Sequence, residues 1–185
     1  MAHDNRDAQL VERARAGDQA AFAELVTTYQ QSLVGYLRNL TGEREVALDL
    51  VQETFLRAYH ALGRTRPGLL VRPWLFRIAT NLAYDYLRRR RRVAWVPLEA
   101  AAHQGGRDVL ADVAEQELVR EALASLRLPE RAVLLLCGLE GLAYAEVALI
   151  VGLSPEAVRK RFARAKEHFR LAYAALGGAV PPEAA

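Results

Sequence analysis

Hydrophobic residues recur with the spacing of an α-helix along almost the whole chain, and no stretch shows the alternation that a half-buried strand requires. One apolar stripe covers residues 22–40, a second covers residues 46–62, and a glycine follows each of them. A shorter helix is predicted around residues 10–16, with Gly17 as its C-terminal cap. The pattern therefore predicts an all-helical fold.

A helix with two distinct faces is predicted after residues 63–73, a loop in which prolines and glycines interrupt the periodicity. This helix should run from Trp74 to about Arg92. The side chains expected on its core face are Leu75, Ile78, Ala79, Leu82 and Tyr86. The side chains on its other face, which is polar with an aromatic ring at one end, are Trp74, Arg77, Asn81, Asp85 and Arg88.

The helical periodicity fails again over residues 93–115, which contain a proline and a pair of adjacent glycines. We interpret this segment as a flexible linker with at most one short helical patch. It divides the chain into a domain at residues 1–92 and a domain at 116–177, followed by a disordered tail at 178–185. The predicted fold is therefore two small helical domains joined by a linker.

The most informative segment covers residues 142–166, which are typical of two short helices around a tight turn. Gly152 supplies the turn because it reaches left-handed backbone angles without a Cβ clash. Ser154 is the expected N-cap of the second helix, and Pro155 is its first residue. Side chains predicted to point into the domain are Val158, Phe162 and Ala165. Side chains predicted to point outward are Glu156, Lys160 and Arg164, with Arg159 and Arg161 on the flanks.

This arrangement is a helix-turn-helix pattern, and its cationic second helix suits the major groove of DNA. For this segment alone, the alternative is an amphipathic surface helix whose charges only keep it soluble. Net charge along the chain is +5 over residues 1–92, −4 over 93–126 and +2 over 127–185. Two cationic blocks fit two separate contacts with a polyanion, although a solvated surface explains each block singly.

Composition favours a globular protein of the cytoplasm. Of the 185 residues, 52% are hydrophobic and 25% are charged. No apolar run approaches the roughly 20 residues needed to span a bilayer, so no membrane insertion is expected. The N-terminus lacks a basic segment followed by an apolar one, the pattern of a secretion signal.

No constellation for catalysis or metal binding is found in the sequence. The 4 histidines are scattered without ligand spacing, and there is neither a phosphate-binding glycine loop nor a nucleophile elbow. The single cysteine, Cys137, lies in an apolar run and is expected to be a small buried hydrophobic residue. We therefore expect no enzyme activity, no cofactor and no metal site.

Three stretches in register resemble one protein family. They are DLVQETFLRAYHAL at residues 49–62, RPWLFRIATNLAYDYLRRRRR at residues 72–92, and the C-terminal helix-turn-helix. Together they resemble the extracytoplasmic-function group of bacterial sigma factors, which are promoter-recognition subunits of RNA polymerase. The resemblance covers residues 18–176 and implies an alternative sigma factor that directs core RNA polymerase to specific promoters.

The resemblance implies that the helix at residues 49–62 docks on the largest subunits of core polymerase. The residues that it assigns to this contact are Asp49, Leu50, Gln52, Glu53, Phe55 and Leu56. Asp49 and Glu53 fall on one helical face and can pair with basic groups of a partner. The alternative is that both are ordinary surface carboxylates, while Phe55 and Leu56 serve the core.

By the same resemblance, the loop at residues 64–73 and the helix after it open the minus-ten promoter element and read it as single-stranded DNA. The implied residues are Arg72, Trp74, Arg77, Asn81 and Arg88. An aromatic ring, an amide and cations suit unstacked bases and their phosphates. The alternative for Trp74 is a core aromatic, and the alternative for the arginine run at 88–92 is a solvated helix end or a general polyanion patch.

The second domain would bind the minus-thirty-five element as duplex DNA. The implied residues are Ser154, Glu156, Arg159, Lys160, Arg161 and Arg164. Arginine and lysine can donate to guanine, and glutamate can accept from cytosine. The chain departs from the family pattern at Leu69 and Leu70 in the recognition loop, where polar residues are usual, and at Ala143, which replaces a hydroxyl cap.

The resemblance also implies an anti-sigma partner that covers the polymerase-binding or DNA-binding surfaces. A competing hypothesis is a one-component transcription regulator, whose helix-turn-helix binds duplex operator DNA without polymerase. A third hypothesis is a helical scaffold whose basic patches bind protein partners.

Overall fold

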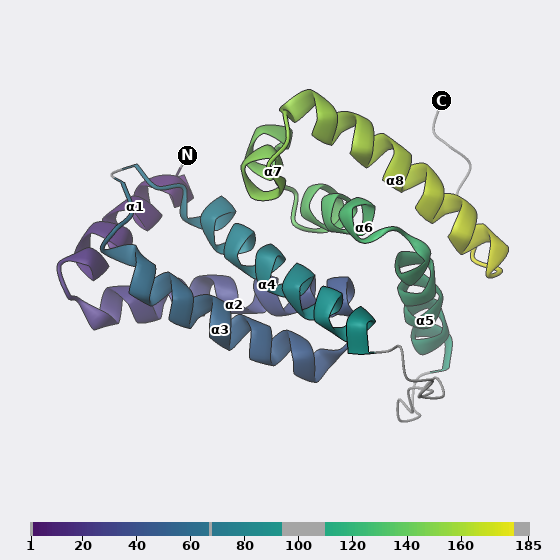
Figure 1. Ribbon diagram of the computed structural model, residues 1–185, viewed down its shortest axis with the longest axis horizontal. Helices are drawn as coiled ribbons and strands as arrows, with labels where there is room; N and C mark the ends of the chain where they lie inside the picture. Colours follow the sequence, from purple (N-terminus) through teal and green to yellow (C-terminus); the bar gives the residue numbers. More distant parts are fainter. Residues whose placement is uncertain (1, 67, 94–109, 180–185) are drawn as a thin grey trace.

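The computed structural model describes residues 2–66, 68–93 and 110–179, and within these ranges the chain forms helices and no strand (Figure 1). The first module consists of α1 (Ala2–Arg15), α2 (Gln19–Thr41), α3 (Arg44–Leu62) and α4 (Val71–Val93). The second consists of α5 (Leu110–Ser125), α6 (Leu128–Leu134), the π-helix η1 (Leu135–Leu139), α7 (Tyr144–Val151) and α8 (Pro155–Ala175). The all-helical prediction is confirmed. Predicted linker residues 94–109 and tail residues 180–185 lie outside the described residues.

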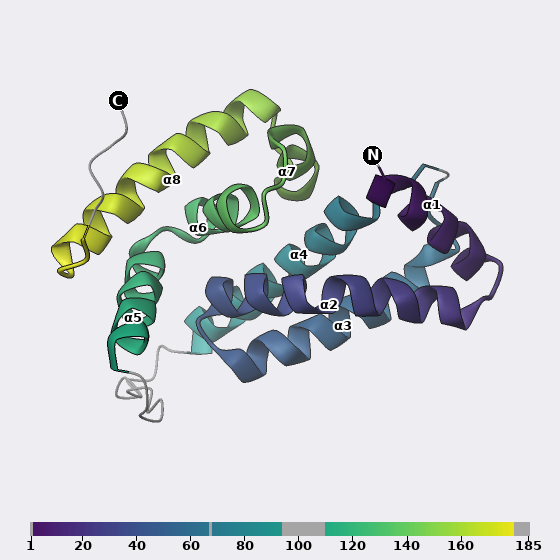
Figure 2. The same ribbon diagram turned by 180° about the vertical axis from the view of Figure 1, so that it is seen from behind.

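Helices α2, α3 and α4 of the first module pack against one another, and α1 lies against α2 (Figure 2). The Tyr36 side chain is fully buried. It meets the edge of the Phe76 ring with centroids 5.3 Å apart, and its hydroxyl is hydrogen bonded to that of Thr80 at 2.8 Å. Asp18 caps α2 at its N-terminus, and Gly42 ends the helix in a left-handed conformation with φ 84°.

Helix α1 is longer than its predicted extent of residues 10–16. Its early residues are polar, so apolar periodicity gives no signal for them. Tertiary contacts stabilise them instead, because Arg6 donates to Glu24 of α2 at 3.0 Å and Asp7 accepts from the hydroxyl of Tyr29. The predicted left-handed glycine after the helix, Gly17, is confirmed with φ 96°.

Helix α4 differs from its predicted form in its start and in its buried surface. It begins at Val71 rather than Trp74, because Pro73 lies in the first turn, where its missing N–H breaks no hydrogen bond. Phe76 and Thr80 are buried in addition to most of the predicted core face. The buried surface is wider because α4 is covered by α2 and α3 and also by α7 of the second module.

The second module packs α5, α6 and α7 against α8. Helix α7 ends at Gly152 with φ 69°, and the Ser154 hydroxyl accepts from the Ala157 N–H at 3.2 Å. Pro155 is the first residue of α8, so the predicted turn, cap and helix start are confirmed. Helix α5 begins at Leu110, which lies inside the segment predicted as linker.

The two modules pack directly against each other. Helix α7 packs against α4, while η1, α5 and α6 meet α2. The second module lies beside the first in both views (Figure 1 and Figure 2). A linker alone does not enforce such a contact. Side chains from both modules therefore hold this arrangement. A predicted surface residue that takes part in the contact is not free to bind a ligand.

Candidate nucleic-acid interfaces

The outer face of α8 is cationic and is positioned by a buried inner face. Val158 and Ala165 are buried and fix the rotation of the helix. The predicted minus-thirty-five residues that are exposed on the outer side are Ser154, Glu156, Arg159, Lys160 and Arg164. Five of the six predicted residues therefore share one accessible surface.

Glu156 pairs with both of its basic neighbours on this surface. Its carboxylate accepts two hydrogen bonds from Arg159, at 3.0 and 2.8 Å, and lies 3.6 Å from the ammonium of Lys160. The hydrogen bond from Arg159 lowers the pKa of Glu156 below its usual value. All three side chains are solvated, so these pairs are weak and exchange readily for contacts with another charged ligand.

Arg161 does not share the outer face. It is half-buried and lies one helical turn beyond the buried Val158. Its charge acts on Tyr84 of α4, where it opposes the burial that raises the pKa of Tyr84 to about 12. One predicted minus-thirty-five residue is thus half-buried and near enough to the first module for its charge to act on Tyr84.

The outer face of α4 presents the predicted polar surface of the first module. Arg77, Asn81 and Arg88 are exposed, and Arg88 pairs with Asp85 at 2.8 Å. Trp74 is half-buried and packs against the hydrophobic core, so only part of its ring is accessible. This surface combines two cations, an amide and an aromatic edge.

Arg72 points away from that surface. At about 100° per residue, it stands about 200° round the helix from Trp74. Its guanidinium donates to the main-chain carbonyl of Glu140 and lies 3.4 Å from the Glu140 carboxylate. It also stacks over the Phe76 ring at 5.9 Å. The structure therefore separates Arg72 from the other four predicted minus-ten residues.

The predicted polymerase-binding residues of α3 divide between surface and core. The exposed ones are Asp49, Gln52 and Leu56, the half-buried ones are Leu50 and Glu53, and Phe55 is buried. Leu56 is 53% exposed, so the alternative that it serves the core is wrong. Glu53 pairs with Arg57 of the same helix at 2.7 Å.

Tyr59 belongs to the apolar stripe at residues 46–62 but lies at the surface. It is 48% exposed, and its ring meets the edge of the Phe22 ring with centroids 5.1 Å apart. Together with Leu56 it forms an exposed apolar pair on α3. The sequence signal for this pair is weak, because a periodic stripe does not distinguish a residue facing the core from one facing a partner.

A cavity of about 270 Å³ lies where the loop before α4 meets both modules. Residues of its lining include Asp7, Tyr29, Leu69, Leu70, Arg72 and Glu146. Glu146 comes from α7 and also accepts from the N–H of Ala143 at 2.9 Å, which is the half of a capping box that needs no hydroxyl at position 143. The two leucines of the recognition loop thus border a mixed polar and apolar cavity that includes a carboxylate of the second module.

A set of polar side chains that sequence reasoning missed joins the two modules. We call it the seam, and it consists of Ser32, Arg72, Arg131 and Glu140. The Glu140 side chain, just after η1, is only 7% exposed. Burial raises the pKa of Glu140, while the charge of Arg72 and a hydrogen bond from Ser32 oppose the rise.

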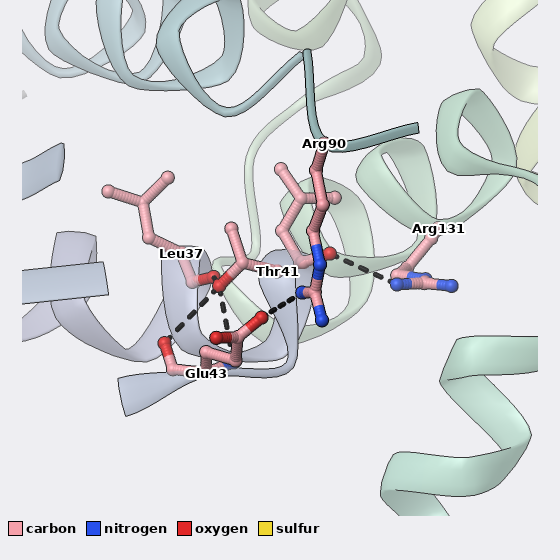
Figure 3. A network of polar contacts seen from close by, with 6 residues as sticks. Leu37, Thr41, Glu43, Arg90 and Arg131 are labelled. Atoms are coloured by element: carbon pink, nitrogen blue, oxygen red, sulfur yellow. Dashed lines mark hydrogen bonds and ion pairs between the residues drawn. The ribbon is translucent and has the colours of Figure 1, made fainter. Parts of the chain in front are cut away.

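Arg131 of α6 lies at the C-terminal ends of two helices (Figure 3). Its Nη1 donates to the Leu40 carbonyl of α2 at 3.0 Å, and its Nη2 donates to the Ala124 carbonyl of α5 at 2.6 Å. Carbonyls in the last turn lack partners within their own helix and carry the negative end of its dipole. Figure 3 also shows Arg90 paired with Glu43 beside this contact. Burial lowers the pKa of Arg131.

Other chemistry is limited in the part of the chain that the structure describes. It holds no group of three His, Cys, Asp or Glu residues that could bind a metal ion. No helix among the described residues is long and apolar enough to cross a membrane. Cys137 is half-buried, and burial raises the pKa of its thiol to about 11, so it is a poor nucleophile.

Known families and relatives match both modules. The sigma-70 region 2 family matches residues 25–93, and the sigma-70 region 4 family matches residues 116–169. The RNA polymerase sigma-H factor of Pseudomonas aeruginosa is 34% identical over 180 residues, covering 90% of this chain and 93% of the relative. The ECF RNA polymerase sigma-E factor of Haemophilus influenzae is 34% identical over 182 residues, covering 90% and 95%.

Two solved structures share the fold. CnrH, solved in complex with the cytosolic domain of CnrY, is 30% identical with a TM-score of 0.73, and the match covers 92% of this chain and 98% of CnrH. The sigma factor RpoE, solved with the anti-sigma factor NepR from Bartonella quintana, is 24% identical with a TM-score of 0.69, covering 82% and 95%. The second likeness concerns the fold alone.

Proposed function

The chain belongs to the ECF RNA polymerase sigma factors, and we propose how its surfaces divide the work of promoter recognition. As an alternative sigma factor, it binds core RNA polymerase and directs it to specific promoters. The observation that carries this conclusion is the match of both sigma-70 regions, in order, to the two modules. A one-component regulator is not favoured, because it accounts for the helix-turn-helix but not for the region 2 match.

The exposed side of α3 is the proposed docking surface for core polymerase. Leu56 gives it an apolar contact that burial in a partner would stabilise, and Tyr59 extends that contact. Asp49 and Gln52 are exposed around it and can meet polar groups of the partner. In this proposal Phe55 positions α3 from inside the core, and Leu50 and Glu53 line the edge of the surface.

The outer face of α4 is the proposed minus-ten surface. Arg77 and Arg88 are placed to hold phosphates of an opened strand, and Asn81 between them can hydrogen bond a base edge. Trp74 offers a partial stacking surface at the start of the helix. Arg72 joins this surface only if it leaves Glu140.

The outer face of α8 is the proposed minus-thirty-five surface. Arg159 and Lys160 can donate to guanine, and Glu156 can accept from cytosine once DNA replaces their mutual pairs. The N-terminus of α8 at Ser154 can hold a phosphate. Arg164 lies further along the same side and suits a backbone contact.

The modules correspond in this proposal to residues 1–92 and 116–177, and catalysis resides in the polymerase rather than in this chain. We propose a cytoplasmic location, where core polymerase is found. We also propose an anti-sigma partner, because CnrH and RpoE were solved in complexes and RpoE's partner is an anti-sigma factor.

Binding to purified core polymerase tests the proposed docking surface. Leu56→Asp places a charge in an apolar contact and should reduce both core binding and promoter-dependent transcription by about ten-fold or more. Leu171→Asp is the matched control, because Leu171 is an equally exposed leucine, at 54% against 53%, on α8. Equal behaviour of the two variants would reject the α3 surface, and absence of core binding by the parent chain would reject the function.

A further inference from the structure

A second cavity, also of about 270 Å³, is lined by the end of α4 and by α6. We call it the arginine cavity, and the described residues of its lining are Leu87, Arg90, Arg91, Leu128 and Arg131. No carboxylate belongs to that part of the lining. Three guanidinium groups beside two leucine side chains suit an anion that also has an apolar part.

The charges of the three arginines are balanced unequally. Arg90 forms an ion pair with Glu43 (Figure 3). Arg131 forms none with a described residue, because its Nη atoms donate to main-chain carbonyls, which carry no net charge. Arg91 is exposed and has neither a hydrogen bond nor an ion pair with a described residue. Two of the three positive charges in this part of the chain therefore have no carboxylate partner.

The guanidinium of Arg131 is held in place but is incompletely satisfied. Burial lowers the pKa of Arg131, and the nearby charge of Arg91 lowers it further. Its Nε is the one buried side-chain nitrogen or oxygen without a hydrogen-bond partner in the described ranges. Such atoms are rare in folded proteins. An anion between Arg91 and Arg131 would offset their repulsion and favour the charged form of both.

The charge and shape of the arginine cavity select one class of anion. Two unpaired guanidinium groups match an anion with about two negative charges. A phosphate monoester carries about −1.5 to −2 at pH 7 and has three strong acceptor oxygens. A carboxylate carries only one charge, and so does each phosphodiester of DNA. The planar fork of arginine matches phosphate geometry, and the leucines can cover an apolar group attached to the phosphate.

We propose that the arginine cavity binds the phosphate monoester group of a small organic molecule. Arg91 and Arg131 hold the phosphate, and Leu87 and Leu128 cover the apolar group next to it. Arg90 stays with Glu43 and borders the site. This binding site goes beyond promoter recognition and does not depend on the proposed function.

Titration of the full chain with phenyl phosphate, followed by isothermal calorimetry, tests the site. Phenyl phosphate combines a dianionic phosphate with an apolar ring and should bind saturably, with one molecule per chain. Methyl phenyl phosphate keeps the ring but carries a single charge, so it should bind about ten-fold more weakly or worse. Absence of saturable binding of phenyl phosphate, or equal affinity for the two compounds, would overturn the proposal.

Two variants of exposed arginines on α4 locate the binding. Arg91→Gln removes an unpaired charge from the cavity and should lower the affinity for phenyl phosphate by about ten-fold or more. Arg89→Gln makes the same change about 200° round the helix, outside the lining, and should bind as the parent does. Both should keep the urea midpoint of the parent, because neither side chain is buried. Equal loss of affinity in both variants would show general charge attraction and overturn the site.

The apolar part of the site has a separate test. Leu87 is half-buried, and Leu87→Ala removes apolar surface without changing charge. This variant should bind phenyl phosphate several-fold more weakly and inorganic phosphate as well as the parent does, as measured by phosphorus NMR titration. Unchanged affinity for phenyl phosphate, or an equal loss for the two anions, would reject the assigned role of the leucines.

Binding of core polymerase by the same preparation keeps the site and the function apart. A chain that binds core but not phenyl phosphate rejects the site and leaves the proposed function intact. A chain that binds phenyl phosphate through Arg91 but has no affinity for core rejects the proposed function and supports the site.

Discussion

The outer face of α8 and the seam use the same residue types in opposite ways. On α8, Glu156 pairs with Arg159 in solvent, whereas in the seam Glu140 faces Arg72 while only 7% exposed. A solvated pair contributes little to stability and exchanges easily for another charged ligand. A buried pair is tolerated only when each group finds partners, and loss of one partner leaves an uncompensated charge. The charges of α8 are therefore available to DNA, and those of the seam are committed to the fold.

Removal of Arg131 should have the largest effect on stability of any single change to these two regions. Arg131→Ala leaves the last-turn carbonyls of α2 and α5 without their donor and should lower the free energy of unfolding by about 3 kcal/mol. Urea denaturation of the full chain measures this loss. Arg170→Ala, which removes an arginine from a solvated pair with Glu167 on α8, should cost far less. Similar losses for both would erase the distinction between the two regions.

Loss of an arginine on the proposed minus-thirty-five surface should leave stability unchanged and reduce DNA binding. Arg159→Ala should weaken holoenzyme binding to a minus-thirty-five duplex by about ten-fold or more, because one good base contact discriminates at that level. Asn81→Ala should leave duplex binding unchanged and reduce promoter opening, detected by the reactivity of unpaired thymines. Equal loss of both steps in each variant would contradict the assignment of one element to each module.

The smallest expected effect is on the pH dependence of stability, to which Glu140 and Glu167 contribute in opposite directions. Burial raises the folded-state pKa of Glu140 above its usual 4.5, so its contribution to stability is present below that value and is lost as pH rises through the raised pKa. A hydrogen bond from Arg170 lowers the pKa of Glu167, so its contribution is present above the usual value and is lost as pH falls through the lowered pKa.

Replacement by glutamine isolates each contribution, because glutamine does not titrate and keeps an acceptor oxygen. Relative to the parent, Glu140→Gln should gain stability as pH rises through the weakly acidic range. Relative to the parent, Glu167→Gln should lose stability as pH rises through the same range. Urea denaturation across that pH range measures both, and slopes of the same sign for the two variants would show that Glu140 is not buried in solution.

Local rules were sufficient to predict the helix-turn-helix from the sequence. Each signal acts within one turn of its own position. Gly152 ends α7 in a left-handed conformation, Ser154 caps the N-terminus of α8, and Pro155 occupies the first helical position, where no N–H is needed. The inner and outer faces of α8 follow from helical spacing alone. The cationic outer surface could therefore be predicted residue by residue, except for Arg161.

The seam could not be predicted, because helical spacing gives the face of a residue but not its partner. Arg72 and Glu140 are 68 positions apart, and Arg131 and Leu40 are 91 apart. The π-helix η1 also widens the turn before Glu140, so the ordinary helical period does not give its direction. The exposure of Tyr59 could not be predicted for a related reason, because helical periodicity does not distinguish an apolar residue that faces the core from one that faces a partner.

The two modules pack against each other in the structure, and we expect them to stand apart at a promoter. Fluorophores at Gln30 and Ala174, in a chain with Cys137→Ala, report their separation by single-molecule energy transfer in the free chain and in promoter-bound holoenzyme. We expect high transfer in the free chain and low transfer in the holoenzyme, with a distance increase on the order of tens of ångströms. The same high transfer in both states would contradict the claim.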